Sequence, residues 1–173
     1  DLSLQAAAHF SLGQAYYALG NYPQAIDFHR QSVASAEGER TREHVSERIL
    51  RAVTSRAWLA WSLAEVGEFP EGIARGEEGV RMAEAVDQPY SLIAAYLGMG
   101  VLYLRKGDLH RAIPMLERCL SLCQVGHLPV YFPWVSMCLG AAYALAERVT
   151  EASPLLQQAV EQAASMNIMG RHL

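Results

Sequence analysis

Residues 11–26 read SLGQAYYALGNYPQAI, and similar stretches occur three more times in the 173-residue chain. The matching stretches cover residues 58–73, 98–113 and 138–153, at successive spacings of 47, 40 and 40 residues. A period of roughly 20–50 residues is typical of arrays in which one small structural unit stacks on the next. The repeat therefore predicts the architecture before any single element is considered.

The aligned positions keep their physical character from one stretch to the next. A small residue recurs as Gly13, Ala60, Gly100 and Gly140. A large one follows three positions later, on the same helical face, as Tyr16, Leu63, Tyr103 and Tyr143. The first helix then ends at Gly20, Gly67 and Gly107, where a left-handed residue is favoured. Glu147 stands at the fourth such place, which predicts either a costlier left-handed residue or a different last turn.

A second apolar pattern follows each turn. Its small positions are Ala25, Gly72, Ala112 and Ala152, and its large ones are Val33, Val80, Leu120 and Val160. Each unit is therefore predicted to be an antiparallel helix pair with small residues at the crossing. We expect helices near residues 2–19, 22–37, 41–66, 69–86, 89–106, 109–124, 130–146 and 150–165. Pro114 and Pro154 predict that the helices containing them either start late or kink.

The quoted stretch resembles the tetratricopeptide repeat (TPR) family. The matching features are L-G-x-x-Y, then Gly and an aromatic residue, then Ala, in SLGQAYYALGNYPQA. The period of about 40 residues is similar to the long-period variety, including the carboxy-terminal arrays of large bacterial signalling and regulatory proteins. The resemblance implies an all-α solenoid wound as a right-handed superhelix, whose first helices line a concave groove. In the family, that groove receives a peptide, a helix or a neighbouring domain.

The domain organisation predicted from the repeat is a single solenoid segment over residues 1–173. Its repeats lie near 1–38, 41–87, 88–127 and 128–167, and residues 168–173 start a further one. The chain begins with Asp1 and has no polar capping helix at either end, so we expect a piece excised from a longer protein. Uncapped terminal helices can stack end to end, so we expect that self-association can occur.

Composition excludes several classes of partner. The 14 basic and 18 acidic residues give a net charge of −4, so there is no basic surplus to neutralise a nucleic acid. The longest apolar runs, 92–104 and 130–146, are too short or contain Pro133, so we expect no membrane partner. Three cysteines are typical of a reducing compartment, which predicts a cytoplasmic protein.

Candidate chemical sites are accounted for by packing. Cys119, Cys123 and His127 could share a helical face and hold a metal, but both cysteines align with small residues of the other units. No nucleotide-binding or hydrolase motif is present. We therefore predict no metal, no cofactor and no enzymatic activity.

The resemblance assigns the groove to the first helices. The predicted partner-binding residues are Phe10, Gln14, Tyr17, Trp61, Leu97, Val101, Leu104, Arg105, Trp134 and Met137. The same faces add Ala57, Glu65, Ala141 and Leu145. Places that carry charged or amide side chains in chaperone-tail clamps hold Phe10, Gln14, Trp58, Ala94 and Gly98, so a chaperone-tail clamp is not expected. The apolar lining favours an amphipathic helix or apolar segment. Alternatively, these residues pack against a flanking domain of the same chain or the next superhelical turn.

Two roles follow from this pattern. The first is a non-catalytic protein–protein interaction scaffold that binds a peptide, helix or neighbouring domain in an apolar concave groove. The alternative is the regulatory or sensor arm of a multidomain bacterial ATPase, cyclase or transcription regulator. A thiol or metal-dependent enzyme is the third hypothesis, and we reject it because packing accounts for every candidate residue.

Overall fold

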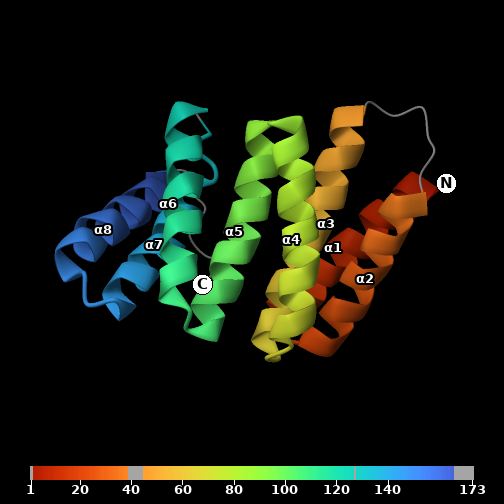
Figure 1. The fold of residues 1–173 in the computed structure, drawn as a ribbon, viewed down its shortest axis with the longest axis horizontal. Helices are drawn as coiled ribbons and strands as arrows, with labels where there is room; N and C mark the ends of the chain where they lie inside the picture. The colour runs from red at the N-terminus through yellow and green to blue at the C-terminus, as the bar shows by residue number, and fades with distance from the viewer. Residues whose placement is uncertain (1, 39–44, 127, 166–173) are drawn as a thin grey trace.

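The computed structural model describes residues 2–38, 45–126 and 128–165. All regular structure in these ranges is helical, without strands. The helices are α1 (Leu2–Ala18), α2 (Tyr22–Gly38), α3 (Val45–Glu65), α4 (Phe69–Val86), α5 (Pro89–Lys106), α6 (Leu109–Val125), α7 (Phe132–Leu145) and α8 (Val149–Ser165). Figure 1 shows them in one row, from α1 and α2 at one end to α7 and α8 at the other. The chain is an all-α solenoid, as the repeat predicted.

Successive helix pairs are joined by one recurring apolar interface. Each helix packs against the next along the chain, and α3 also packs along α5. Between the first two pairs, Ile26 and Val33 of α2 cluster with Leu59 and Leu63 of α3. At the next interface, Ile73 and Val80 of α4 pack against a cluster that contains Met99 and Tyr103 of α5. A helix pair cannot bury both of its faces alone, so this repeated contact holds the stack together.

The small residues of the repeat lie where helices come closest. A Cβ atom on Gly100 would lie 2.6 Å from Leu116 Cδ2, and one on Gly140 would lie 2.5 Å from Leu156 Cδ2. These contacts join the two helices of a pair. Gly98 makes the corresponding approach between pairs, because a Cβ atom there would lie 2.7 Å from Ala57 Cβ. The absence of a side chain at Gly98 thus lets α3 and α5 pack side by side.

The turns inside the pairs are left-handed. Gly20, Gly67 and Gly107 have φ angles of 73°, 81° and 77°, as predicted for the residues that end the first helices. Glu147 has φ 60°, so the fourth pair keeps the same turn with a side chain that is costlier there than glycine.

The prolines do not delay the helices that contain them. α6 begins at Leu109 and α8 at Val149, so Pro114 and Pro154 lie inside their helices, and of the two predicted alternatives the late start is excluded. In α6 the reason is local: the side chain of Asp108 accepts a hydrogen bond from the backbone N–H of Arg111 at 3.3 Å. This cap fixes the start of α6, and proline removes only one later backbone donor.

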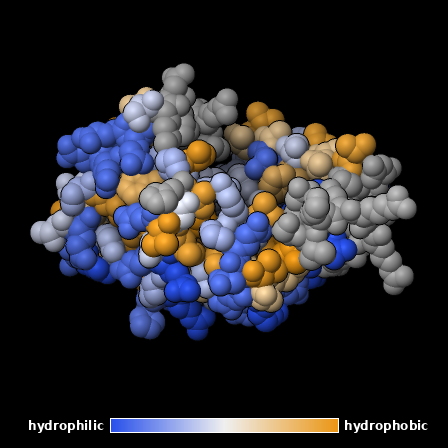
Figure 2. All heavy atoms as spheres, turned by 90° about the horizontal axis from the view of Figure 1, so that it is seen from above, coloured by the Kyte–Doolittle hydropathy of each residue, from blue (hydrophilic) through white to orange (hydrophobic). Residues whose placement is uncertain are grey.

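Other boundaries agree with the repeat to within about two residues. α7 covers Phe132–Leu145, slightly less than the expected 130–146. Residues 41–44, His127 and the start of a further repeat at 168–173 lie outside the described residues. On the face shown in Figure 2, apolar residues form separate patches between hydrophilic ones. None of the described helices combines the length and hydropathy needed to cross a bilayer.

Candidate functional site

The three tryptophans of the chain meet on one side of the stack. Trp58 and Trp61 lie three residues apart, on one face of α3, and Trp134 comes from the first turn of α7. Their ring centroids are 5.2 Å apart for Trp58 and Trp61, 4.8 Å for Trp61 and Trp134, and 5.9 Å for Trp58 and Trp134. Phe10 and Tyr17 of α1 continue the cluster, with ring centroids 6.3 Å and 5.6 Å from that of Trp58.

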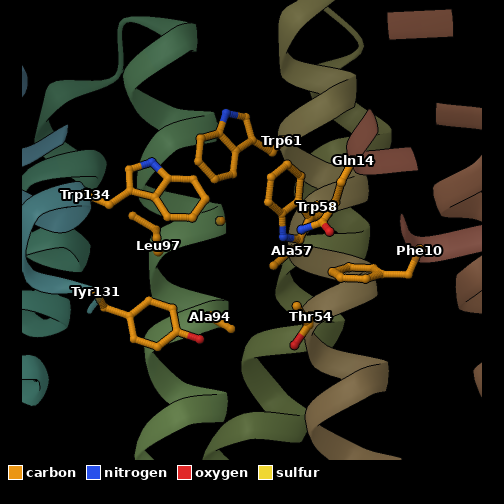
Figure 3. A pocket seen from close by; sticks show the side chains of 11 residues that line it. Phe10, Gln14, Thr54, Ala57, Trp58, Trp61, Ala94, Leu97, Tyr131 and Trp134 are labelled. Carbon is orange, nitrogen blue, oxygen red and sulfur yellow. The ribbon is translucent and has the colours of Figure 1, made fainter. Parts of the chain in front are cut away.

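The three tryptophans and Phe10 line a cavity of about 230 Å³. Figure 3 shows Phe10 and Gln14 on one side, Tyr131 and Trp134 on the opposite side, and α3 and α5 between them. The lining residues are Phe10, Gln14, Thr54, Ala57, Trp58, Trp61, Ala94, Leu97, Gly98, Tyr131 and Trp134. The floor is made of small residues because α3 and α5 approach closely there, whereas the walls are aromatic. The volume is below the roughly 300–1,000 Å³ of typical small-molecule sites, so it fits one or two side chains better than a cofactor.

None of the described residues that line the cavity is acidic or basic. Its polar groups are the amide of Gln14, the hydroxyls of Thr54 and Tyr131, and the indole N–H groups. Thr54 donates its hydroxyl to the backbone oxygen of Leu50 at 2.6 Å. Trp61 is 7% exposed, and its indole N–H has no hydrogen-bond partner among the described residues. Burying a charge without a partner is costly, so the cavity suits an uncharged group.

A polar cluster adjoins the aromatic one at the carboxyl end of α3. Glu65 Oε1 accepts a hydrogen bond from the Tyr17 hydroxyl at 2.7 Å and another from Arg105 Nε at 3.0 Å. The Glu65 side chain is 12% exposed and that of Arg105 is 52% exposed. Burial, together with the hydrogen bond to Glu65, raises the pKa of Tyr17 far above its ordinary value, so its hydroxyl stays a donor. The cluster joins α1, α3 and α5 and leaves the guanidinium of Arg105 facing solvent.

His29 of α2 lies behind the aromatic walls. Its ring centroid is 6.0 Å from that of Phe10 and 5.8 Å from that of Trp58. The residue is fully buried, and neither ring nitrogen has a hydrogen-bond partner in the described parts of the chain. Burial lowers the pKa of His29 to about 4, so the ring is neutral at physiological pH.

The residues predicted for the groove fall into three groups. Phe10, Gln14, Trp61, Leu97 and Trp134 line the cavity. Tyr17 and Arg105 form the polar cluster beside it. Val101 is 3% exposed and lies in the core, and Leu104 and Met137 are half-buried against that core.

The cavity also contains residues that the prediction did not assign to it. Trp58, Ala94 and Gly98 appeared only as positions that differ from a chaperone clamp, and Thr54 and Tyr131 were not named. Trp58 could have been found from its spacing of three residues from Trp61. Tyr131 gave no such signal, because it lies in the turn before α7.

The cysteines are buried packing residues. Cys119 donates a hydrogen bond to the backbone oxygen of Ile93 at 3.5 Å. Its hydrogen bond with Cys123 and its burial raise the pKa of Cys119, and burial raises the pKa of Cys138 to about 12. Cys119 and Cys138 are therefore weak nucleophiles, whereas the hydrogen bond with Cys119 lowers the pKa of Cys123. Within the described residues, no three His, Cys, Asp or Glu side chains are grouped as metal ligands would be.

Comparison with known proteins agrees with this architecture. Two models of the tetratricopeptide repeat family match, one over residues 8–43 and the other over residues 93–125. No curated protein sequence matches the chain.

Three solved structures share the fold at low sequence identity. Aspartyl phosphate phosphatase F from Bacillus subtilis matches with a TM-score of 0.75 and 14% identity over 98% of this chain. BtubC from P. vanneervenii matches with a TM-score of 0.71 and 22% identity over the whole chain. The apo form of RapI matches with a TM-score of 0.72 and 11% identity over 94% of the chain. The chain spans 43% of the phosphatase, 68% of BtubC and 57% of RapI. At these identities the likeness concerns the fold alone.

Proposed function

Because this chain is a tetratricopeptide repeat protein, we propose that it is a non-catalytic scaffold that binds a protein segment in the cavity between α1, α3, α5 and α7. The observation that carries the proposal is the cavity itself, which has aromatic walls, a floor of small residues and no charged lining residue. Trp58 and Trp134 are partly exposed beside this open space, and such tryptophans are typical of protein-binding surfaces. The occupant is a peptide, a helix or a neighbouring domain that presents apolar side chains.

The energetic case rests on one inserted side chain. Binding energy at protein interfaces is concentrated in a few apolar anchors that fill well-packed pockets, with surrounding contacts that exclude water. Here Trp58, Trp61 and Trp134 already contact one another, so they are held in place before a partner arrives. Such preorganisation reduces the entropy lost on binding. A partner acceptor that reached Trp61 Nε1 would also satisfy its unpaired N–H.

The experiment is a peptide selection followed by titration of a matched pair of variants. Peptides selected from a displayed random library on the wild-type chain are synthesised and titrated by calorimetry. Ala94→Trp fills the cavity from its floor, whereas Ala74→Trp adds the same side chain at an exposed position on α4. We expect Ala94→Trp to weaken binding by at least about tenfold and Ala74→Trp to leave it unchanged. Equal affinities for both variants would contradict the proposal.

The tryptophans also provide a local reporter. All three tryptophans of the chain line the cavity, so the three indole N–H signals in a ¹H–¹⁵N NMR spectrum all come from the site. A bound segment should shift these signals before it shifts those of the second helices. The alternative role, as the sensor arm of a larger regulatory polypeptide, needs an occupant of the same cavity and is open to the same titration.

Self-association through the first helix is a separate proposal that one observation favours. Leu12 of α1 is 42% exposed, whereas its counterparts Leu59, Met99 and Leu139 are each 1% exposed. The preceding helix pair covers those three, so the outer face of α1 offers an apolar contact of the same kind. Sedimentation velocity over a range of concentrations should show association that Leu12→Gln reduces. A monomer at all concentrations would contradict this.

A further inference from the structure

The cavity is elongated, and a charged side chain lies beyond one of its ends. Its two walls come from α1 and α7, and its floor comes from α3 and α5, so the hollow runs along α3 and α5 (Figure 3). Trp61 and Trp134 close together over one end, with ring centroids 4.8 Å apart. Beyond Trp61, in the next turn of α3, lies Glu65 with its partner Arg105. A segment that inserts one side chain into the cavity and continues along the surface past this end therefore passes the guanidinium.

The charge that such a segment meets is positive. Arg105 is 52% exposed, whereas Glu65, which holds it, is 12% exposed and accepts hydrogen bonds from both Tyr17 and Arg105. The acidic member of the pair is thus covered and the basic member faces outward. At the carboxyl ends of α3 and α5 the charged residues are Glu65, Arg105 and Lys106, so basic residues outnumber acidic ones there although the whole chain has a net charge of −4. The surface at this end is complementary to a carboxylate.

Sequence distance along α5 gives the spacing. Leu97 lines the cavity and Arg105 follows eight residues later in the same helix, which corresponds to about 12 Å at about 1.5 Å per residue. A partner helix spans that distance in seven or eight residues, and an extended segment spans it in three or four.

From this geometry we propose that the partner segment carries a bulky uncharged side chain for the cavity and a carboxylate about 12 Å away for Arg105. The proposal rests on the proposed function and specifies the chemistry of its partner. The uncharged side chain supplies apolar burial among the indoles. The carboxylate accepts charge-assisted hydrogen bonds from the terminal nitrogens of Arg105, whose Nε remains on Glu65. Arg105 therefore sets the direction in which the segment lies.

The test uses peptides selected on the wild-type chain, with substitutions on both sides of the contact. The peptides should be enriched in Phe, Trp, Leu or Met at one position and in Asp or Glu at the spacing given above. Replacing the anchor with Ala should weaken binding by at least about tenfold. Replacing the peptide Glu with Gln should weaken binding to the wild-type chain by about three- to tenfold. The same peptide change should leave the affinity for the Arg105→Gln variant unchanged. Arg105→Lys keeps the charge and should retain most of the affinity.

The outcomes separate the inference from the function on which it rests. Peptides that respond to Ala94→Trp but carry no acidic residue, or that bind equally with Gln in place of Glu, overturn the carboxylate contact and leave the scaffold function standing. If Ala94→Trp leaves binding unchanged, or if no peptide binds, both the carboxylate contact and the scaffold function are overturned. If Arg105→Gln does not fold, the peptide substitutions and the salt dependence of binding to the wild-type chain still decide, because the contact requires affinity that falls with salt.

Discussion

At the crossing of α5 with α6, a glycine of the first helix faces a large side chain of the second, whereas at the crossing of α3 with α4 both facing residues are small. Gly100 lies under Leu116, and Gly13 and Gly140 lie under His29 and Leu156 in the same way. In the second pair, Ala60 faces Gly76, and the space above Gly76 is filled by Met99 of the next pair. Three crossings are therefore packed from within the pair, and one is completed by its neighbour.

This difference shows what the repeat constrains. The side chains at a crossing must fill the gap between the helices, and the volume comes from the second helix or, at the second crossing, from the adjacent pair. The first pair adds a second contrast, because it places an ionisable ring where the third and fourth pairs place leucine. Substitutions at these crossings test whether the gap must be filled and how much a polar group costs there.

The largest expected effect is at the third crossing. Leu116 is fully buried and covers Gly100, so Leu116→Ala leaves a cavity that glycine on the opposite helix cannot fill. We expect a loss of about 2–5 kcal/mol in the free energy of unfolding, measured by urea denaturation. Leu156→Ala is the matched control, because Leu156 is only half-buried and should cost less. Equal losses at both positions would mean that the burial of the leucine does not determine how much it stabilises the crossing.

The next effect is a dependence of stability on pH. The pKa of His29 is about 4 in the folded chain and about 6.5 when exposed, so below pH 6.5 the unfolded chain takes up a proton that the folded chain does not. Stability should therefore fall as the pH falls from about 6.5 to about 4, by roughly 3 kcal/mol in total, and should not change from this source above 6.5.

The variant His29→Leu gives the first crossing the chemistry of the third and fourth. It removes two unpaired buried nitrogens, so we expect unfolding at pH 7 to cost about 1 kcal/mol more. It should also flatten the dependence on pH between about 6.5 and 4, while the exposed control His110→Gln should keep it. Thermal melts at several pH values measure both effects. A variant with an unchanged pH profile would show that His29 is not the group responsible.

The repeat pattern predicted the helices well because it reports local geometry. Small residues, turn glycines and apolar columns each constrain a few neighbouring residues, so helix ends follow from the sequence. The way in which the space at the second crossing is filled does not follow from the sequence, because Met99 reaches Gly76 from the next helix pair, 23 positions along the chain. A reader of the sequence sees an unmatched glycine there but not the side chain that fills the space.

Only part of the cavity lining could be predicted from the sequence, for a similar reason. Helical periodicity places Leu97 and Val101 on one face, but only Leu97 lines the cavity, whereas Val101 packs in the core. Tyr131 forms part of a wall although it precedes α7, and its aligned positions hold Leu4, Arg51 and Ser91, which share no property with it. Residues in helices could be assigned from spacing, whereas a residue placed by the path of a turn could not.

A pair of glycine substitutions sharpens the comparison of the crossings directly. Gly100→Ala places a Cβ atom 2.6 Å from Leu116 Cδ2, in a fully buried contact, and should cost about 1–3 kcal/mol. Gly76→Ala meets the flexible side chain of Met99, which can move, so the gain in helix propensity of about 1 kcal/mol that both substitutions share offsets more of its cost. We expect Gly76→Ala to be close to neutral in urea unfolding. A loss as large as that of Gly100→Ala would show that Met99 is as rigidly packed as Leu116.

The smallest expected effect measures how much a polar contact between helix pairs adds to the apolar packing that joins them. The hydroxyl of Tyr143 on α7 donates to Glu117 Oε1 on α6 at 2.8 Å, and Arg148 lies 4.1 Å from the centre of its ring. Tyr143→Phe keeps the ring and removes the hydrogen bond, so unfolding should cost about 0.5–1.5 kcal/mol less. Tyr16→Phe is the control, because that ring stacks on Phe28 within its own pair at 5.4 Å. A loss as large for Tyr16→Phe, which keeps its ring contact and removes only the hydroxyl, would mean that the hydroxyl contact between α6 and α7 adds little to the cohesion of the stack.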